Sequence, residues 1–165
     1  DVNYIPEKLM NAIELYREFP ETETREQQAL MGVWHVGQLL KIQARRFFRE
    51  YLSSEMQFNI MLLLKHADHP MNQQELSEKL LVDKSNLTGV AGRMEAAGLL
   101  IRRVDPLDSR AYQLELTSRG RKILEHVEMP YRAEVKKVMA DFSPAELSML
   151  IRFMERMRKT LNSEE

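Results

Sequence analysis

The sequence of 165 residues is 44% hydrophobic and 30% charged, as expected for a soluble globular protein, and its formal net charge is −1. It contains no cysteine, which excludes disulfides, thiolate nucleophiles and thiol redox sensing. No apolar run approaches the ~20 residues that span a bilayer, and no signal-peptide pattern opens the chain, so we expect a cytoplasmic protein. The start at Asp1 instead of a methionine indicates a trimmed N-terminus or missing residues.

Two helices are predicted in the first 51 residues. Residues 6–19 show an amphipathic pattern that Pro20 ends, and a charged connector follows at 21–26. Residues 27–51 then repeat apolar side chains at helical spacing. We interpret the basic residues of this second helix as a solvated face: Lys41, Arg45, Arg46 and Arg49.

A third helix is predicted from a Ser54 cap, with Gln57 three residues on, to about His66. Its apolar side chains nearly encircle it, so we expect it at the centre of the fold. His66 and His69 are three residues apart, which suits zinc, but no cysteine and no third ligand accompany them. We therefore predict surface histidines and no metal site. The extended segment 69–71 can add a short strand to the sheet that follows.

The stretch from 72 to 117 has the most informative pattern, two short helices and then two strands joined by a polar loop. Asn72 opens the first helix, with Glu75 in a capping-box position, and Asp83 opens the second. The second helix has an apolar stripe at Leu87, Val90, Ala91 and Met94. Its opposite face, with Lys84 in the first turn, is polar and cationic: Ser85, Asn86, Thr88, Gly89, Gly92 and Arg93.

A face of this kind suits the major groove of DNA. Serine, threonine and asparagine can bond base edges or phosphates, and arginine can bind guanine through two hydrogen bonds. For the helix alone, an ordinary solvated face is the better interpretation. Gly89 and Gly92 argue mildly for a close approach to the backbone, since each costs a helix roughly 1 kcal/mol relative to alanine, although drift explains them equally well.

Strands at 99–104 and 111–116 form a hairpin, or wing, around the loop 105–110. An arginine at a hairpin tip can enter the minor groove, and Arg110 has that position. Asp108 can hold this arginine by a charge-assisted hydrogen bond, and a surface ion pair with no further role is the alternative. Arg102 near the end of the first strand adds a further cation.

Two helices follow the wing. The first begins near Ser118 and contains Pro130, which should kink or interrupt it. The second begins at a Ser143 cap with Pro144 at its first position. Its apolar stripe needs a partner: Leu147, Leu150, Ile151, Met154 and Leu161.

The charge of the chain is unevenly distributed. Residues 83–122 hold eight basic and five acidic side chains, a net charge of +3. Residues 1–30 hold three basic and seven acidic side chains, a net charge of −4. The positive charge is therefore concentrated where a winged helix would meet phosphate.

Several motifs together resemble the MarR family of transcriptional regulators, in order and spacing: Ser85-Asn86-Leu87-Thr88, Gly98-Leu99-Leu100-Ile101-Arg102, Asp108-Ser109-Arg110 and Leu116-Thr117-Ser118-Arg119-Gly120. The resemblance implies a homodimeric winged-helix repressor or activator. Helices at both ends would intertwine in the dimer, with the stripe of Leu147, Leu150, Ile151 and Met154 at the interface. Gly89 departs from the family, whose members often have an arginine or another polar residue there, so base preference does not carry over.

The resemblance also implies a cleft beside the long helix 27–51, where small aromatic acids can bind. The residues that would line it are Trp34, His35 and Gln38. Core or dimer packing is the better single interpretation of Trp34, the only tryptophan.

We therefore predict a mainly α fold with a small β-wing, a winged helix-turn-helix domain plus N- and C-terminal dimerisation helices. Residues 1–165 form a single domain, divided into 1–51, 52–117 and 118–165. The predicted function is sequence-specific binding of double-stranded DNA at a palindromic operator by a homodimer. We expect it to be a transcriptional regulator, with repression favoured over activation. We expect release by a small aromatic or anionic effector, and no cofactor, metal or membrane partner.

Two other functions are alternatives. A winged helix can bind a protein instead of DNA, because a fold does not fix a function. An enzyme is disfavoured, because the sequence shows no phosphate-binding glycine loop, metal-ligand cluster or nucleophile motif.

Overall fold

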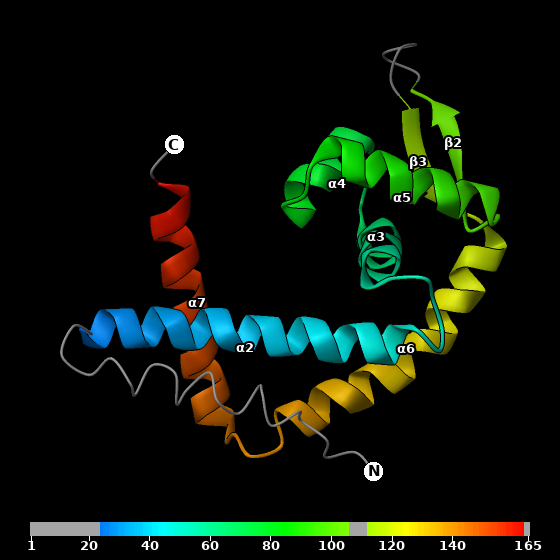
Figure 1. Cartoon of the computed structure of the whole chain (residues 1–165). Helices are drawn as coiled ribbons and strands as arrows, with labels where there is room; N and C mark the ends of the chain where they lie inside the picture. The colour runs from blue at the N-terminus through cyan, green and yellow to red at the C-terminus, as the bar shows by residue number, and fades with distance from the viewer. Residues whose placement is uncertain (1–23, 106–111, 164–165) are drawn as a thin grey trace.

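The structure is a computed structural model that describes residues 24–105 and 112–163, so the helix predicted at 6–19 lies outside the described residues (Figure 1). The described chain is mainly helical with one small sheet, which confirms the predicted fold class. Its elements are α2 (Arg25–Phe48), α3 (Glu55–His66), β1 (Met71–Asn72), α4 (Gln73–Leu80), α5 (Lys84–Ala96), β2 (Leu100–Val104), β3 (Tyr112–Leu116), α6 (Ser118–Val138) and α7 (Pro144–Asn162).

Helix α2 begins and ends earlier than the predicted range of 27–51. Thr24 caps it, because the Thr24 side chain accepts from the Gln27 N–H and Gln27 Oε1 accepts from the Thr24 N–H at 2.9 Å. The segment from Arg25, which we assigned to a connector, is therefore helical. At the other end, the N–H groups of Tyr51 and Leu52 turn back to the Phe48 carbonyl at 2.9 and 2.7 Å, which ends the helix.

Helix α3 occupies the centre of the fold, as predicted. Its Ile60 and Met61 are fully buried, and its Phe58 ring contacts the rings of Phe48 from α2 and Tyr131 from α6, with centroid distances of 4.9 and 4.7 Å. An ion pair between Lys65 Nζ and Glu128 Oε2 at 2.7 Å adds a polar contact between α3 and α6. The end of α2, the whole of α3 and the middle of α6 therefore form one core.

The three strands form an antiparallel sheet in the order β1-β3-β2. Met71 pairs with Leu114, and Leu100 pairs with Leu116. The pairing of β1 confirms that the segment before α4 adds a short strand to the wing. In β3 the side chains of Leu114 and Leu116 are buried and Tyr112 is exposed, so one end of the strand is fixed in the core and the other projects with the wing.

Helix α5 ends at Ala96, and Gly98 follows two residues later and turns the chain. Gly98 has φ +68°, a left-handed conformation that glycine adopts at low cost. The N–H of Gly98 donates to the Glu95 carbonyl and the N–H of Leu99 donates to the Met94 carbonyl, both at 2.9 Å. These are the two bonds of a Schellman motif, and they turn the chain from α5 into β2.

The chain returns from the wing at a junction formed by Thr117 and Gly120. The Thr117 hydroxyl donates to the Gly98 carbonyl at 2.7 Å and accepts from the Gly120 N–H at 3.0 Å, while the Thr117 N–H donates to the Leu99 carbonyl at 3.1 Å. A Cβ at Gly120 would lie 2.1 Å from the Leu99 carbonyl oxygen. Only glycine therefore allows α6 to start this close to the backbone of Leu99.

The two C-terminal helices follow the predicted pattern. Helix α6 continues through Pro130 without interruption, and Figure 1 shows that it changes direction along its length, as expected for a proline kink. Helix α7 begins with the predicted cap, in which the Ser143 N–H donates to Glu146 Oε2 at 2.8 Å and the Ser143 hydroxyl accepts from the Glu146 N–H.

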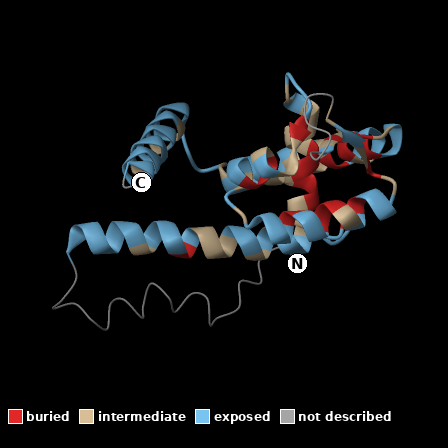
Figure 2. Cartoon of the chain, turned by 90° about the horizontal axis from the view of Figure 1, so that it is seen from above, coloured by how far each residue is buried: buried red, intermediate tan, exposed pale blue. Residues whose placement is uncertain are grey.

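Burial is concentrated in one half of the molecule (Figure 2). The buried residues gather on α3, α4, α5, the sheet and the first half of α6, whereas α7 has none. Large apolar side chains are exposed on the remaining helices, among them Leu30, Trp34 and Val36 of α2, Val135 and Val138 of α6, and Met149, Ile151, Phe153 and Leu161 of α7.

His69 lies between two carboxylates just before β1. Its Nδ1 is 2.6 Å from Asp68 Oδ1, and its Nε2 is 2.6 Å from Glu75 Oε1. Both ring nitrogens can donate only in the protonated imidazolium. The hydrogen bonds to Asp68 and then Glu75 raise the pKa of His69, and the bond from His69 lowers the pKa of Asp68.

Replacing Gly120 by alanine should lower the free energy of unfolding by about 1–3 kcal/mol, because the added Cβ meets backbone that cannot move without disturbing the junction. The measurement is urea unfolding at one fixed protein concentration. The matched control is Gly32→Ala, since a Cβ there meets nothing within 4 Å and alanine favours helix α2. Equal unfolding free energies of the two variants would contradict the claim that the junction has no room for a Cβ at Gly120.

Replacing His69 by glutamine should cost most stability at acidic pH. A raised pKa in the folded state means that the stabilisation is fully present below the ordinary histidine pKa of about 6.5 and is lost as pH rises through the raised value. The difference in unfolding free energy between wild type and variant should therefore shrink as pH rises above about 6.5 and through the raised pKa of His69. A difference that does not change with pH would show that the two carboxylates do not hold the imidazolium.

Candidate nucleic-acid interface

Helix α5 is oriented by its apolar stripe. Leu87, Val90, Ala91 and Met94 are all buried, as predicted, and α5 packs against α3, α4 and β2. Because the stripe faces the core, the opposite face of the helix must face away from the protein. The sequence pattern thus determines which residues α5 presents.

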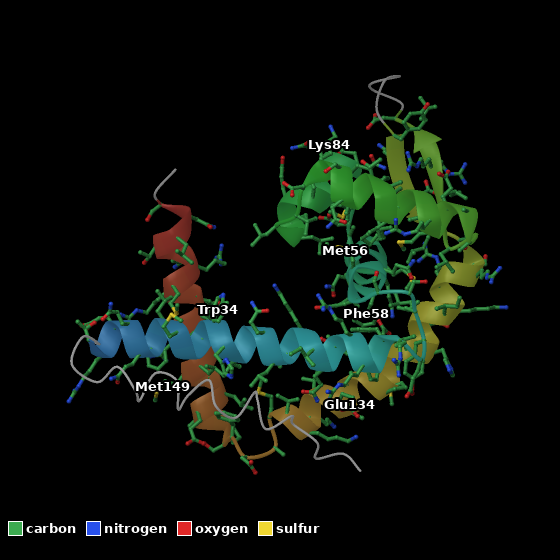
Figure 3. All side chains as sticks on the ribbon, in the orientation of Figure 1. Trp34, Met56, Phe58, Lys84, Glu134 and Met149 are labelled. Carbon is green, nitrogen blue, oxygen red and sulfur yellow. The ribbon has the colours of Figure 1, made fainter. Side chains whose placement is uncertain are left out.

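The predicted polar face of α5 is exposed. The exposed residues are Lys84, Ser85, Asn86, Thr88, Gly89 and Arg93, and Figure 3 shows Lys84 on the side of α5 turned away from α2. Within residues 24–105 and 112–163, neither Lys84 nor Arg93 forms an ion pair. Two cations and several short polar side chains therefore share one surface.

Two arginines extend over the glycines of α5. A Cβ at Gly89 would lie 3.6 Å from Arg93 Nη1, and a Cβ at Gly92 would lie 3.9 Å from Arg102 Nη2. Arg102 belongs to β2, and its Nε lies 3.0 Å from Glu95 Oε2 of α5. Gly92 therefore leaves room for a side chain that connects the wing to the recognition helix.

The wing is described up to its tip. Arg103 Nε donates to Glu115 Oε2 at 2.8 Å between β2 and β3, and Gln113 Nε2 donates to Asp105 Oδ2 at 3.0 Å. These bonds stabilise the hairpin where it leaves the core. Asp108 and Arg110, predicted as the minor-groove pair, lie outside the described residues.

Two features of the helix-turn-helix were not found from the sequence. Leu81, in the turn between α4 and α5, is 89% exposed and has φ +52°, which is uncommon for leucine. Thr88 Oγ1 of α5 lies 3.3 Å from Oε1 of Gln73, and Gln73 is the first residue of α4. Neither has a signal in the hydrophobic periodicity, because one is a backbone conformation and the other joins residues of different helices.

The residues predicted to line an effector cleft lie on α2 in three different environments. The Trp34 side chain is 57% exposed, His35 is 8% exposed and Gln38 is half-buried. Figure 3 places Trp34 on the part of α2 distant from the winged helix. Trp34 is therefore not part of the core of the described chain, and its place in an effector cleft or a dimer contact stays a prediction.

The residues predicted for dimerisation form one face of α7. Leu147 and Leu150 are half-buried, and Ile151 and Met154 are 60% and 38% exposed. A shallow, mainly apolar concavity runs along this face, between Leu150, Ile151, Met154, Glu155 and Arg158. An apolar face of this length is unusual on a solvated helix and is typical of a helix that packs on a partner.

The described residues contain neither a metal-ligand cluster nor a membrane-spanning helix. They contain no group of three or more histidine, cysteine, aspartate or glutamate side chains placed to hold a metal ion. None of the described helices has the length and apolar character needed to cross a bilayer.

Known sequences related to the chain are regulators. The model of the MarR family matches residues 54–111. The uncharacterized HTH-type transcriptional regulator YdgJ of Bacillus subtilis is 30% identical over 112 residues, which cover 68% of this chain and 68% of YdgJ. The HTH-type transcriptional repressor YetL of the same species is 30% identical over 102 residues, 61% of each chain.

Solved structures share the fold. AbsC, a MarR family transcriptional regulator from Streptomyces coelicolor, superposes with a TM-score of 0.78 at 23% identity, covering 86% of this chain and 97% of AbsC. The transcriptional regulator PcaV from the same organism, solved in complex with its natural ligand, superposes with a TM-score of 0.66 at 20% identity. The match covers 79% of this chain and 92% of PcaV. Together with the exposed polar face of α5, these matches show that the chain belongs to the MarR family of DNA-binding transcriptional regulators, which are not enzymes.

Proposed function

We propose that this regulator binds a palindromic operator in double-stranded DNA as a homodimer, with α5 in the major groove and Arg110 of the wing in the minor groove. The observation that carries the proposal is the exposed face of α5, where Lys84 and Arg93 have no ion-pair partner in the described chain. Unpaired cations on such a face can neutralise phosphates and bond guanine without first breaking a bond within the protein.

Ion pairing divides the basic residues of this region into two groups. Arg102 and Arg103 are held by Glu95 and Glu115, at 3.0 and 2.8 Å. Their first role is therefore to hold β2 on α5 and on β3, and a contact of Arg102 with DNA stays a prediction. Lys84 and Arg93 remain as the cations of the described chain that the proposal assigns to DNA directly.

A second copy of the chain is the partner that best fits the apolar faces of α2 and α7. Two-fold symmetry lets one self-complementary face cover another, so a single exposed stripe suffices. In the dimer that we propose, the two α5 helices would lie on one face about one DNA turn apart, which fits a palindrome. Large exposed apolar side chains on α2, α6 and α7 support this assembly.

Repression and release by a small aromatic or anionic effector complete the proposal. The relative YetL is named a repressor, and PcaV was solved with its natural ligand. An effector near Trp34, His35 and Gln38 of α2 would stabilise a dimer geometry that does not fit the operator. It can shift that equilibrium only by the difference between its affinities for the two geometries.

A winged helix that binds a protein instead of DNA is the second candidate. The exposed Leu81 in the turn of the helix-turn-helix favours it, because an apolar side chain there has little to gain from phosphate. Binding to duplex DNA that weakens with salt separates the candidates, since a protein-docking surface would show neither.

Replacing Lys84 by alanine should weaken operator binding at every sequence to a similar degree. It should also reduce the slope of log Kd against log salt by about one for each lysine lost, or about two for a dimer, because fewer counterions are released. Fluorescence anisotropy at several salt concentrations measures both. The control is Lys136→Ala, an exposed lysine in the last turn of α6, which should leave the slope unchanged. Equal slopes of log Kd against log salt for the two variants would show that Lys84 does not contact DNA phosphate.

Replacing Leu150 by glutamate should dissociate the dimer and abolish operator binding together, because a charge would be buried in the apolar face of α7. Light scattering gives the mass, and anisotropy gives the affinity. Ser148→Glu adds the same charge on an exposed position of the same helix and should remain dimeric. A dimeric Leu150→Glu protein would rule out this face as the interface.

A further inference from the structure

The hydroxyl group of Thr88 is turned away from the outer surface of α5, toward its own helix and α4. Thr88 Oγ1 lies 2.7 Å from the Lys84 carbonyl oxygen, one turn back in α5. It also lies 3.3 Å from Oε1 of Gln73, at the start of α4. Thr88 is an exposed residue of the face assigned to DNA, yet its polar atom is engaged within the protein.

Proton counting decides how these three groups are bonded. A threonine hydroxyl has one proton, and the 2.7 Å distance to the Lys84 carbonyl is the usual length of an O–H···O bond. The proton is therefore used there, and no proton remains for the oxygen of Gln73. The contact with Gln73 becomes favourable when the amide turns over and its nitrogen donates to Thr88 Oγ1.

The same rotation explains a second observation. Gln73 Nε2 is buried and has no hydrogen-bond partner when it points away from Thr88. A buried donor without a partner is costly and rare, whereas a carbonyl oxygen with an unused lone pair is more common. Turning the amide gives the donor a partner, so Gln73 holds the Thr88 hydroxyl from the side of α4.

With its hydroxyl donating to the Lys84 carbonyl and accepting from the turned amide of Gln73, Thr88 has no proton left to donate to a base and keeps one Oγ1 lone pair. Its γ-methyl is the group that remains for an apolar contact. We propose that Thr88 contacts the C5-methyl group of a thymine in each half-site, and that Gln73 is the residue that positions it. The inference rests on the proposed function, since it requires α5 to lie in the major groove. Thymine is the base with a methyl group on that edge, and a threonine methyl can make this apolar contact.

The neighbouring residue supports a close approach. Gly89 follows Thr88 and has no side chain, and the atom nearest to a Cβ there is Arg93 Nη1, at 3.6 Å. The group over Gly89 is thus the end of the flexible Arg93 side chain, so a base edge that approaches the Thr88 methyl meets Arg93 and no side chain at position 89. Gly89, which gives no base contact of its own, would act by leaving this space open.

The test uses the full-length protein and an operator obtained by selection from random duplex DNA. Each thymine of the half-site is replaced in turn by deoxyuridine, in both half-sites together, which removes the methyl group and keeps base pairing. At one thymine the affinity should fall about fourfold per half-site, or about fifteenfold for the palindrome, the effect of one buried methyl group per half-site. The same fall should be seen on the thymine operator with Thr88→Ser, which keeps the hydroxyl and loses the methyl.

Three variants identify the group that makes the contact. Thr88→Ser should no longer distinguish thymine from deoxyuridine at that position, whereas Thr88→Val, which keeps a methyl and loses the hydroxyl, should still do so. Gln73→Met, which has a similar length but no amide, should bind with a smaller thymine-to-deoxyuridine ratio than wild type. An unchanged ratio in Gln73→Met would overturn the positioning role, because a merely structural role would alter stability and not this ratio.

Failures of the inference and of the proposed function are distinguishable. If wild type selects no operator, the proposed function fails. If it selects an operator whose half-site lacks thymine, or in which no deoxyuridine lowers affinity, the methyl contact is wrong while DNA recognition stands. If Thr88→Ser keeps full affinity and Thr88→Val loses it, the hydroxyl makes the contact and the inference is overturned.

Discussion

The winged helix depends on one junction, where the backbone at Leu99 meets the start of α6. The Leu99 carbonyl accepts from the Thr117 N–H, the Thr117 hydroxyl donates to Gly98, and Gly120 leaves the space that a Cβ would fill. Gly98 ends α5 and Leu99 leads into β2, so the same few atoms determine where the recognition helix stops and where the wing begins and returns. The relation between α5 and the wing is therefore fixed by hydrogen bonds from Thr117 to the backbone of Gly98 and Leu99.

The rest of the molecule divides into a packed half and a half that needs a partner. The packed half contains α3, the helix-turn-helix, the sheet and the start of α6, and its core fixes the outward face of α5 (Figure 2). The other half contains α7 and the first part of α2, where large apolar side chains are exposed. A dimer formed through these helices would connect its geometry directly to the spacing of the two recognition helices, which is how an effector bound there could act on DNA binding.

The sequence predicts what depends on local spacing and misses what depends on tertiary placement. The apolar stripe of α5 and the cap of α7 follow from helical periodicity and capping chemistry, and the structure confirms them. The predicted start of α2 at residue 27 is wrong, because the capping box of Thr24 lies in a charged segment that resembles a connector. The Arg102–Glu95 and Thr88–Gln73 contacts were missed, because each joins residues of different elements. Asp108, Arg110 and the first helix lie outside the described residues, so these predictions stay predictions.

The most direct test of the central claim, that two copies of α5 present their polar faces to DNA, is selection of bound fragments from random duplex DNA at one fixed, moderate salt concentration. The account predicts enrichment of a palindrome whose half-site centres lie about 10 bp apart, the spacing of two recognition helices in successive major grooves. Recovery of no enriched sequence, with binding that disappears as salt rises, would contradict it, because that result leaves only nonspecific attraction between basic side chains and phosphate.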